Sequence, residues 1–115
     1  MKNTKQIYKQ LSLAANKLSP EDFVKQIKKG IGIGGYTDSD KKTVTQMKKD
    51  LSDPVINIII HHTFIGFKKR RLNTNIAHLL VAVFKRFKIK TADDAIDLIR
   101  YLNRYTNLVY GKKVF

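Results

Sequence analysis

Two stretches of this chain carry the same helical spacing of apolar side chains, and this repeat limits the possible folds more than any other feature. In each stretch the positions recur as i, i+3, i+4, i+7, i+8 and i+11, which places them on one face of an α-helix. The β-branched run 55–60 would also suit a strand, but the helical spacing continues for three turns. The two stripes are Ile56, Ile59, Ile60, Thr63, Phe64 and Phe67, then Ile76, Leu79, Leu80, Val83, Phe84 and Phe87.

Capping residues and helix breakers divide the rest of the chain. Ser19-Pro20, Thr37-Asp38 and Thr91-Ala92 each combine a capping hydroxyl with acids in the following turn, so each predicts a helix start. The glycine-rich segment 30–35 and Ser52-Asp53-Pro54 end the helices before them. The predicted inner faces of these helices consist of Ile7, Leu11, Ala14, Ala15 and Leu18; Phe23, Val24 and Ile27; Val44, Met47 and Leu51; and Ala95, Leu98, Ile99, Leu102 and Tyr105.

We therefore expect an all-α fold, a compact single domain of about six short helices covering residues 1–115. Its core is expected over about 18–105, preceded by a basic N-terminal helix. A tight basic connection, 66–72, would join the two striped helices. The tail Gly111 to Phe115 is expected to be loose.

The chain carries 23 Lys and Arg against 9 Asp and Glu, a formal net charge of +14. A folded domain this basic repels itself, and a polyanion such as nucleic acid relieves that repulsion. The charge therefore predicts a nucleic-acid partner. The basic residues are grouped as Lys25, Lys28 and Lys29; Lys41, Lys42, Lys48 and Lys49; Lys68 to Arg71; and Lys85, Arg86, Lys88 and Lys90.

Several functional classes are disfavoured by what the sequence lacks. There is no cysteine, which excludes disulfides, thiol catalysis and cysteine-based zinc sites. Residues 1–18 do not resemble a signal peptide, and the longest apolar stretch, 55–67, is interrupted by polar residues and too short to span a bilayer. We expect a cytoplasmic, nucleoid-associated protein, although a basic surface would also suit anionic lipid.

Three motifs lack the surroundings that their chemistry would need. Gly30, Gly32 and Gly35 match G-x-G-x-x-G by letters, but no strand precedes them and no βαβ unit surrounds them. His61 and His62 are adjacent and point about 100° apart on a helix, so they cannot share a metal ion in the i, i+4 manner. A three-histidine site with His78 stays open, but no carboxylate neighbours any of the three in sequence. No acid pair accompanies a nucleophile. We expect no enzyme activity, no metal, no cofactor and no small-molecule substrate.

The candidate nucleic-acid site combines the basic groups around the second striped helix with aromatic side chains. Rings that stack on bases beside cations that hold phosphates are typical of single-strand binders. The run 68–71 would also suit a solvated loop or a localisation tag, and a helix-turn-helix reader of duplex DNA would use 73–87 with Asn75, His78 and Lys85 outward. The predicted site residues are Lys68, Lys69, Arg70, Arg71, Lys85, Arg86, Lys88, Lys90, Tyr101 and Tyr105, with Tyr110 a further exposed candidate.

Several short blocks resemble the C-terminal domain of the DnaB/DnaD family of bacterial replication initiation proteins. These blocks are Leu18 to Val24, the glycine-rich segment, Val55 to His61, Arg71 to Ile76 and Lys88 to Ala95. The resemblance implies a compact helical domain that is not an enzyme, binds DNA, particularly single strands, and helps to load the replicative helicase. The family's Tyr-x-x-x-Ile-x-x-x-Trp pattern falls on Ile76, Leu80 and Phe84. None keeps the family residue, so we assign DNA contact to the flanking basic residues.

These features predict a DNA-binding accessory of replication initiation that favours single strands and docks a replication protein such as the helicase or initiator. It would be a stand-alone plasmid or phage version, or an excised domain, and self-association is open. One alternative is an adaptor or inhibitor that binds a replication protein alone. Another is a duplex-DNA regulator of a mobile element.

Overall fold

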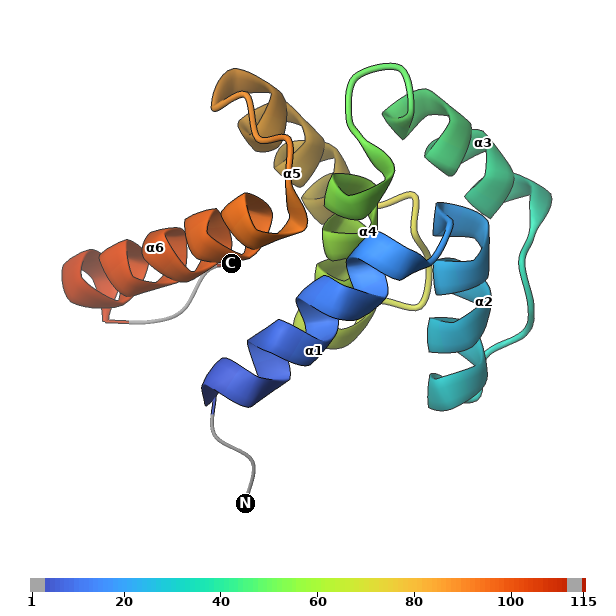
Figure 1. The fold of residues 1–115 in the computed structure, drawn as a ribbon, viewed down its shortest axis with the longest axis horizontal. Helices are drawn as coiled ribbons and strands as arrows, with labels where there is room; N and C mark the ends of the chain where they lie inside the picture. Colours follow the sequence, from blue (N-terminus) through green and yellow to red (C-terminus); the bar gives the residue numbers. More distant parts are fainter. Residues whose placement is uncertain (1–3, 112–114) are drawn as a thin grey trace.

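The computed structural model describes residues 4–111 and residue 115. Within these residues the chain forms an all-α single domain with six α-helices and no strand, which confirms the predicted fold class (Figure 1). The elements are α1 (Thr4–Lys17), α2 (Pro20–Ile31), α3 (Asp38–Met47), α4 (Asp53–His61), the π-helical turn η1 (His62–Gly66), α5 (Asn75–Arg86) and α6 (Ala92–Tyr110).

Helix α4 is the centre of the fold. It packs against α1, α2, α5 and α6 (Figure 1), and every residue from Val55 to Ile60 is buried. The predicted stripe residues Ile56, Ile59 and Ile60 are buried, but the residues between them are buried as well, because neighbouring helices cover α4 on all sides. Its one buried polar side chain, Asn57, donates hydrogen bonds from Nδ2 to the carbonyl oxygens of Ala15 at 3.0 Å and Leu18 at 2.8 Å. These bonds tie the end of α1 to the core.

The first striped segment is not one continuous α-helix. The α-helix ends at His61, and the next turn widens, with the Phe67 N–H donating to the His62 carbonyl at 2.9 Å. A π-helical turn holds an extra residue, which rotates the following positions off the stripe. Phe64 is consequently buried, whereas Phe67 is only partly buried.

The second striped segment forms α5, which begins at Asn75 after its capping residue Thr74. Ala77, Leu80 and Phe84 are buried, but Leu79 and Phe87 are exposed. The predicted inward stripe is thus narrower in the structure than in the sequence. A helix at the edge of a small domain buries only the face that packs against the rest of the domain. For α5 that neighbour is mainly α4.

The predicted capping residues are confirmed. The hydroxyls of Ser19, Thr37 and Thr91 each accept a hydrogen bond from the backbone N–H three residues later. The sequence predicts Leu51 on the same helix as Val44 and Met47. Helix α3 instead ends at Met47, and Leu51 reaches the core from the turn that follows it.

A buried ion pair joins α2 to α3. Lys28 Nζ lies 2.6 Å from Asp40 Oδ2, and the two side chains are 6% and 4% exposed. Lys28 Nζ also donates to the Gly35 carbonyl at 3.3 Å, while Asp40 accepts from the Thr37 N–H at 3.0 Å. Lys28 therefore does not belong to the basic surface to which its position beside Lys29 had assigned it.

Helix α6 is the longest element and extends beyond the body of the domain (Figure 1). Its first half is tied to α1, because Ser12 Oγ donates to Asp93 Oδ1 at 2.5 Å and the Arg100 guanidinium lies 4.6 Å from the Tyr8 ring centre. Ala95 and Ile99 are buried as predicted, but Tyr105 is exposed rather than inward.

The expected loose tail is only partly described, since residues 112–114 lie outside the described residues. Phe115 packs against the core, and its N–H donates to Asn103 Oδ1 at 2.7 Å. Across the described residues, no helix has the length and hydrophobicity needed to cross a membrane.

Candidate nucleic-acid interface

The basic run Lys68 to Arg71 lies between η1 and α5, with all four side chains exposed. Three of them, Lys69, Arg70 and Arg71, line an open hollow of about 620 Å³ in front of the first turn of α5. Asn73, Thr74 and Asn75 contribute polar groups to the same hollow. Cations beside backbone N–H groups at a helix start are well placed to receive phosphate oxygens.

The structure shows a second hollow beside the basic run, which the sequence analysis missed. Arg70 and Arg71 share this hollow, of about 510 Å³, with Gly34, Gly35 and Thr37. A Cβ at either glycine would meet no atom within 4 Å, and neither glycine has a left-handed φ. The fold therefore does not require glycine at these positions. An absent side chain does, however, let an extended ligand approach the backbone closely.

The second basic group lies at the other end of α5. Lys85 and Arg86 end the helix, and Lys88 and Lys90 follow in the connection to α6. This connection is joined to the α3–α4 turn, since Lys85 Nζ lies 3.4 Å from Asp50 Oδ1 and the Ser52 hydroxyl donates to the Lys90 carbonyl at 2.9 Å. Asp50 thus offsets part of the charge of Lys85, whereas the other seven predicted cations make no salt bridge with any described residue.

The predicted cations therefore form two clusters, which we name the entry cluster (Lys68 to Arg71) and the exit cluster (Lys85, Arg86, Lys88 and Lys90). They stand at opposite ends of α5, which has 12 residues and is thus about 18 Å long. A ligand that touches both clusters has to be extended.

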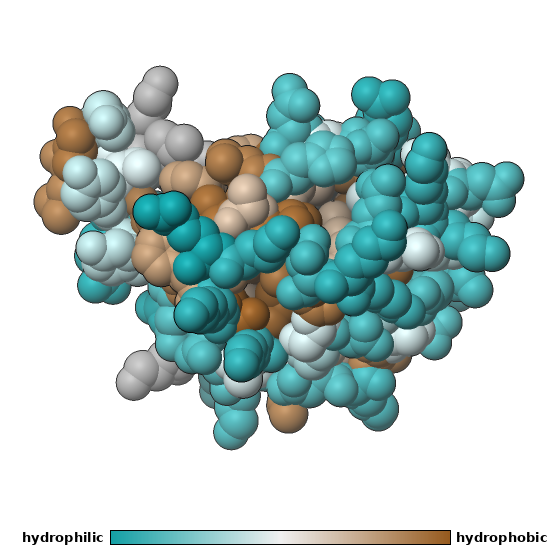
Figure 2. All heavy atoms as spheres, turned by 90° about the horizontal axis from the view of Figure 1, so that it is seen from above, coloured by the Kyte–Doolittle hydropathy of each residue, from teal (hydrophilic) through white to brown (hydrophobic). Residues whose placement is uncertain are grey.

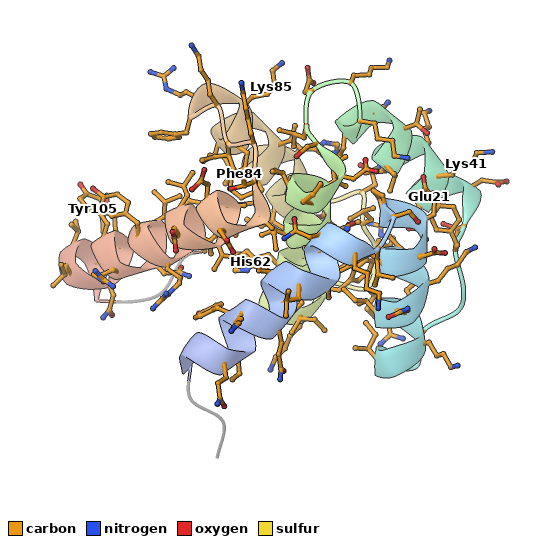
Figure 3. All side chains as sticks on the ribbon, viewed as in Figure 1. Glu21, Lys41, His62, Phe84, Lys85 and Tyr105 are labelled. Atoms are coloured by element: carbon orange, nitrogen blue, oxygen red, sulfur yellow. The ribbon has the colours of Figure 1, made fainter. Side chains whose placement is uncertain are left out.

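The predicted tyrosines lie apart from both clusters. Tyr101 and Tyr105 are 61% and 52% exposed, as stacking would require, but they belong to the projecting part of α6. Figure 3 shows Tyr105 on that helix and Lys85 at the end of α5, on separate parts of the surface. Their role in DNA contact stays a prediction.

Each cluster contains a lysine in a left-handed backbone conformation. Lys68 and Lys88 both have φ of 54° and are the only described non-glycine residues with positive φ. Each directly follows a phenylalanine at the end of a helical segment, where glycine is the usual residue. A side chain in this conformation costs about 1–2 kcal/mol. Lysine at both positions points to a use for the side chain outside the fold.

Replacing Lys68 and Lys88 by glycine should consequently stabilise the protein and should weaken the DNA binding that the sequence predicts. Glycine removes the strain of the left-handed backbone, and this outweighs the free-energy cost of a more flexible unfolded chain. The free energy of unfolding should therefore rise by about 0.5–1 kcal/mol per site. Urea unfolding and titration with a labelled oligonucleotide measure the two effects. Lys69→Gly is the matched control, because it removes the same charge at a residue without positive φ and should not stabilise. A loss of stability in both K68G and K88G would contradict this assignment.

One histidine, His61, does not add to the positive surface at neutral pH. Burial lowers the pKa of His61, so its imidazole stays neutral, and His62 is buried with its ring edge to face with Phe67. His78 is exposed, with Nε2 2.6 Å from Asn73 Oδ1. Among the residues that the structure describes, no three His, Asp or Glu side chains come together as metal ligands.

One further exposed ion pair shapes the charge pattern. Lys48 Nζ lies 2.9 Å from Glu21 Oε1, and this hydrogen bond lowers the pKa of Glu21 and raises the pKa of Lys48. Lys48, from the second basic group of the sequence, is therefore paired with an acid rather than available to a phosphate.

Comparisons with protein-family models, curated proteins and solved structures found no match for this chain.

Proposed function

We propose that this protein is a DNA-binding accessory of replication initiation, without enzyme activity, that holds an extended, preferably single-stranded segment across the two ends of α5. The entry cluster is the observation on which the proposal rests most. Three of its four exposed cations, Lys69, Arg70 and Arg71, line two hollows whose other walls include helix-start polar groups and glycine backbone. Such a surface offers charge and hydrogen-bond donors to phosphates without a groove-reading helix.

An extended strand suits the geometry better than a compact ligand. The exit cluster supplies further cations about 18 Å away along α5, and both clusters are accessible. The resemblance of the short sequence blocks to the DnaB/DnaD family supports a role in replication, with the helicase or initiator as protein partner and the nucleoid as the place of action.

Binding to a single-stranded oligonucleotide should weaken steeply with salt. If roughly five phosphates are neutralised, each contributing about 0.7, the plot of log Kobs against log salt has a slope of about −3 to −4. Fluorescence anisotropy at a series of salt concentrations measures the slope, and competition with duplex DNA of random sequence measures the preference for single strands. A flat salt response would overturn the proposal, and a strong preference for one duplex sequence would favour the regulator alternative.

A second function is favoured by a different observation. The apolar side chains exposed on α6 suit a protein contact better than a nucleic-acid contact, as an adaptor would need. Under that alternative the protein captures an acidic protein partner and does not shift oligonucleotides at low salt.

A further inference from the structure

The hollow in front of the first turn of α5 is apolar as well as basic. Figure 2 shows a face of the molecule on which hydrophilic side chains predominate and hydrophobic ones gather in a few places. Apolar side chains inside a basic site therefore call for an explanation of their own. Leu79, for example, is 45% exposed. The apolar residues that line the hollow together with the cations of the entry cluster are Phe67, Ile76 and Leu79.

The exit cluster also combines an apolar side chain with cations. Phe87 directly follows the last residue of α5, stands between Arg86 and Lys88 in the chain, and is 57% exposed. The pairs Phe67–Lys68 and Phe87–Lys88 are alike, because in each a phenylalanine precedes a lysine of positive φ. Both ends of α5 thus offer apolar surface beside exposed cations.

The charges around these apolar side chains select an anionic ligand. Helix α5 contains no acidic residue, and no acid among the described residues lines the hollow. Within the described part of the chain, Asp50 is the only acid that forms a salt bridge with either cluster. The matching ligand therefore carries negative charges close to apolar groups. An unpaired nucleic-acid strand has this character, whereas a duplex keeps the faces of its bases stacked inside.

We propose that bases of an unpaired strand contact the apolar side chains at the two ends of α5 while the phosphates of that strand lie on the entry and exit clusters. This inference rests on the proposed function and adds the groups that distinguish a single strand from a duplex. The hollow, of about 620 Å³, falls within the range of about 300–1,000 Å³ that is usual for small-molecule sites. It therefore has room for one nucleotide, and Asn73 and Asn75 add polar groups beside it.

An anionic membrane is a poorer occupant of the same surface, although it too presents negative charge next to apolar groups. A bilayer is met by apolar side chains that protrude, because they have to reach below the headgroups. Phe67, Ile76 and Leu79 instead border a hollow that polar groups of the helix start share. A strand that turns one base inward fills this concave shape, whereas a flat lipid surface does not.

Two labelled oligonucleotides of equal length test the proposal by fluorescence anisotropy. One is a thymidine strand, and the other consists of abasic sites, which keep the phosphates and lack the bases. The wild-type chain should bind the thymidine strand about tenfold more tightly. Leu79→Ser with Phe87→Ser should remove this difference by weakening only the thymidine complex, with the salt slope unchanged because no charge is lost. Leu13→Ser is the control, since Leu13 is 61% exposed on α1 and should leave both affinities intact.

The outcomes separate this inference from the proposed function. A wild-type chain that binds neither strand would overturn both. Equal wild-type affinity for the two strands would overturn the inference alone, because the phosphates would then supply all of the binding. The same holds if the double serine variant, with unchanged far-UV circular dichroism, binds the thymidine strand like wild type or loses affinity for both strands equally. Binding to phosphatidylglycerol vesicles that the serine changes abolish, with oligonucleotide binding unchanged, would assign the apolar side chains to a membrane instead.

Discussion

Replacing Lys68, Lys69, Arg70 and Arg71 together by glutamine is expected to weaken single-strand binding on the order of 10²–10³-fold near 0.1 M salt. Each neutralised phosphate releases about 0.7 of a counterion, so the loss of four contacts should also reduce the salt slope by almost three. The four residues are exposed and make no salt bridge with described residues. Folding should therefore be unaffected, or slightly improved by the lower net charge.

The control for this variant removes the same charge elsewhere. Lys9, Lys17, Lys25 and Lys42 are exposed on α1, α2 and α3, and none of them lines a hollow that the entry cluster lines. Their joint replacement by glutamine should reduce affinity only through the weaker overall field of the protein. Equal losses in the two quadruple variants would mean that net charge, rather than the entry cluster, holds the DNA.

Lys28→Met is expected to destabilise the protein by about 3–5 kcal/mol, although lysine is the commonest charged residue in this chain and most lysines are dispensable for folding. The change leaves the Asp40 carboxylate buried without its cation, and removing one member of a buried pair exposes the full desolvation penalty of the other. Urea unfolding followed by circular dichroism measures the loss.

Two companion variants separate this effect from a simple loss of charge. Lys48→Met breaks the Glu21 pair, whose side chains are 40% and 36% exposed, and should cost no more than about 1 kcal/mol. Lys28→Met combined with Asp40→Asn removes both buried charges and should recover part of the stability. If K28M is no more harmful than K48M, the buried pair does not hold α2 and α3 together.

Retention of the Lys28–Asp40 pair also matters for the proposed function. It fixes the Gly34–Gly35 segment through the 3.3 Å hydrogen bond from Lys28 Nζ to the Gly35 carbonyl. The wall that faces Arg70 and Arg71 is thus held by a contact within the core. A variant that loosens the pair should weaken DNA binding even though it leaves every residue of the entry and exit clusters unchanged.

The local signals of the sequence were sufficient for the helix starts, but not for the π-helical turn after α4 or for the end of α3. Ser19, Thr37 and Thr91 cap helices where predicted, because a capping hydroxyl satisfies the backbone N–H groups within a few residues of itself. The spacing of the two stripes likewise placed α4 and α5. The spacing of apolar side chains, however, does not reveal how many neighbouring helices pack around a helix. The burial of α4 on all sides was therefore not predicted.

What the sequence determined by itself is the helical class of the fold, the helix starts and the basic character of the surface, since each depends on residues adjacent in the chain or on composition alone. The tertiary structure decided which charges are functional candidates. It buried Lys28 against Asp40, paired Lys48 and Lys85 with acids, and brought Arg70 and Arg71 beside Gly34 and Gly35. It also left the outer half of α6 uncovered. These outcomes depend on contacts between residues distant in sequence, and only the packing of the helices around α4 specifies them.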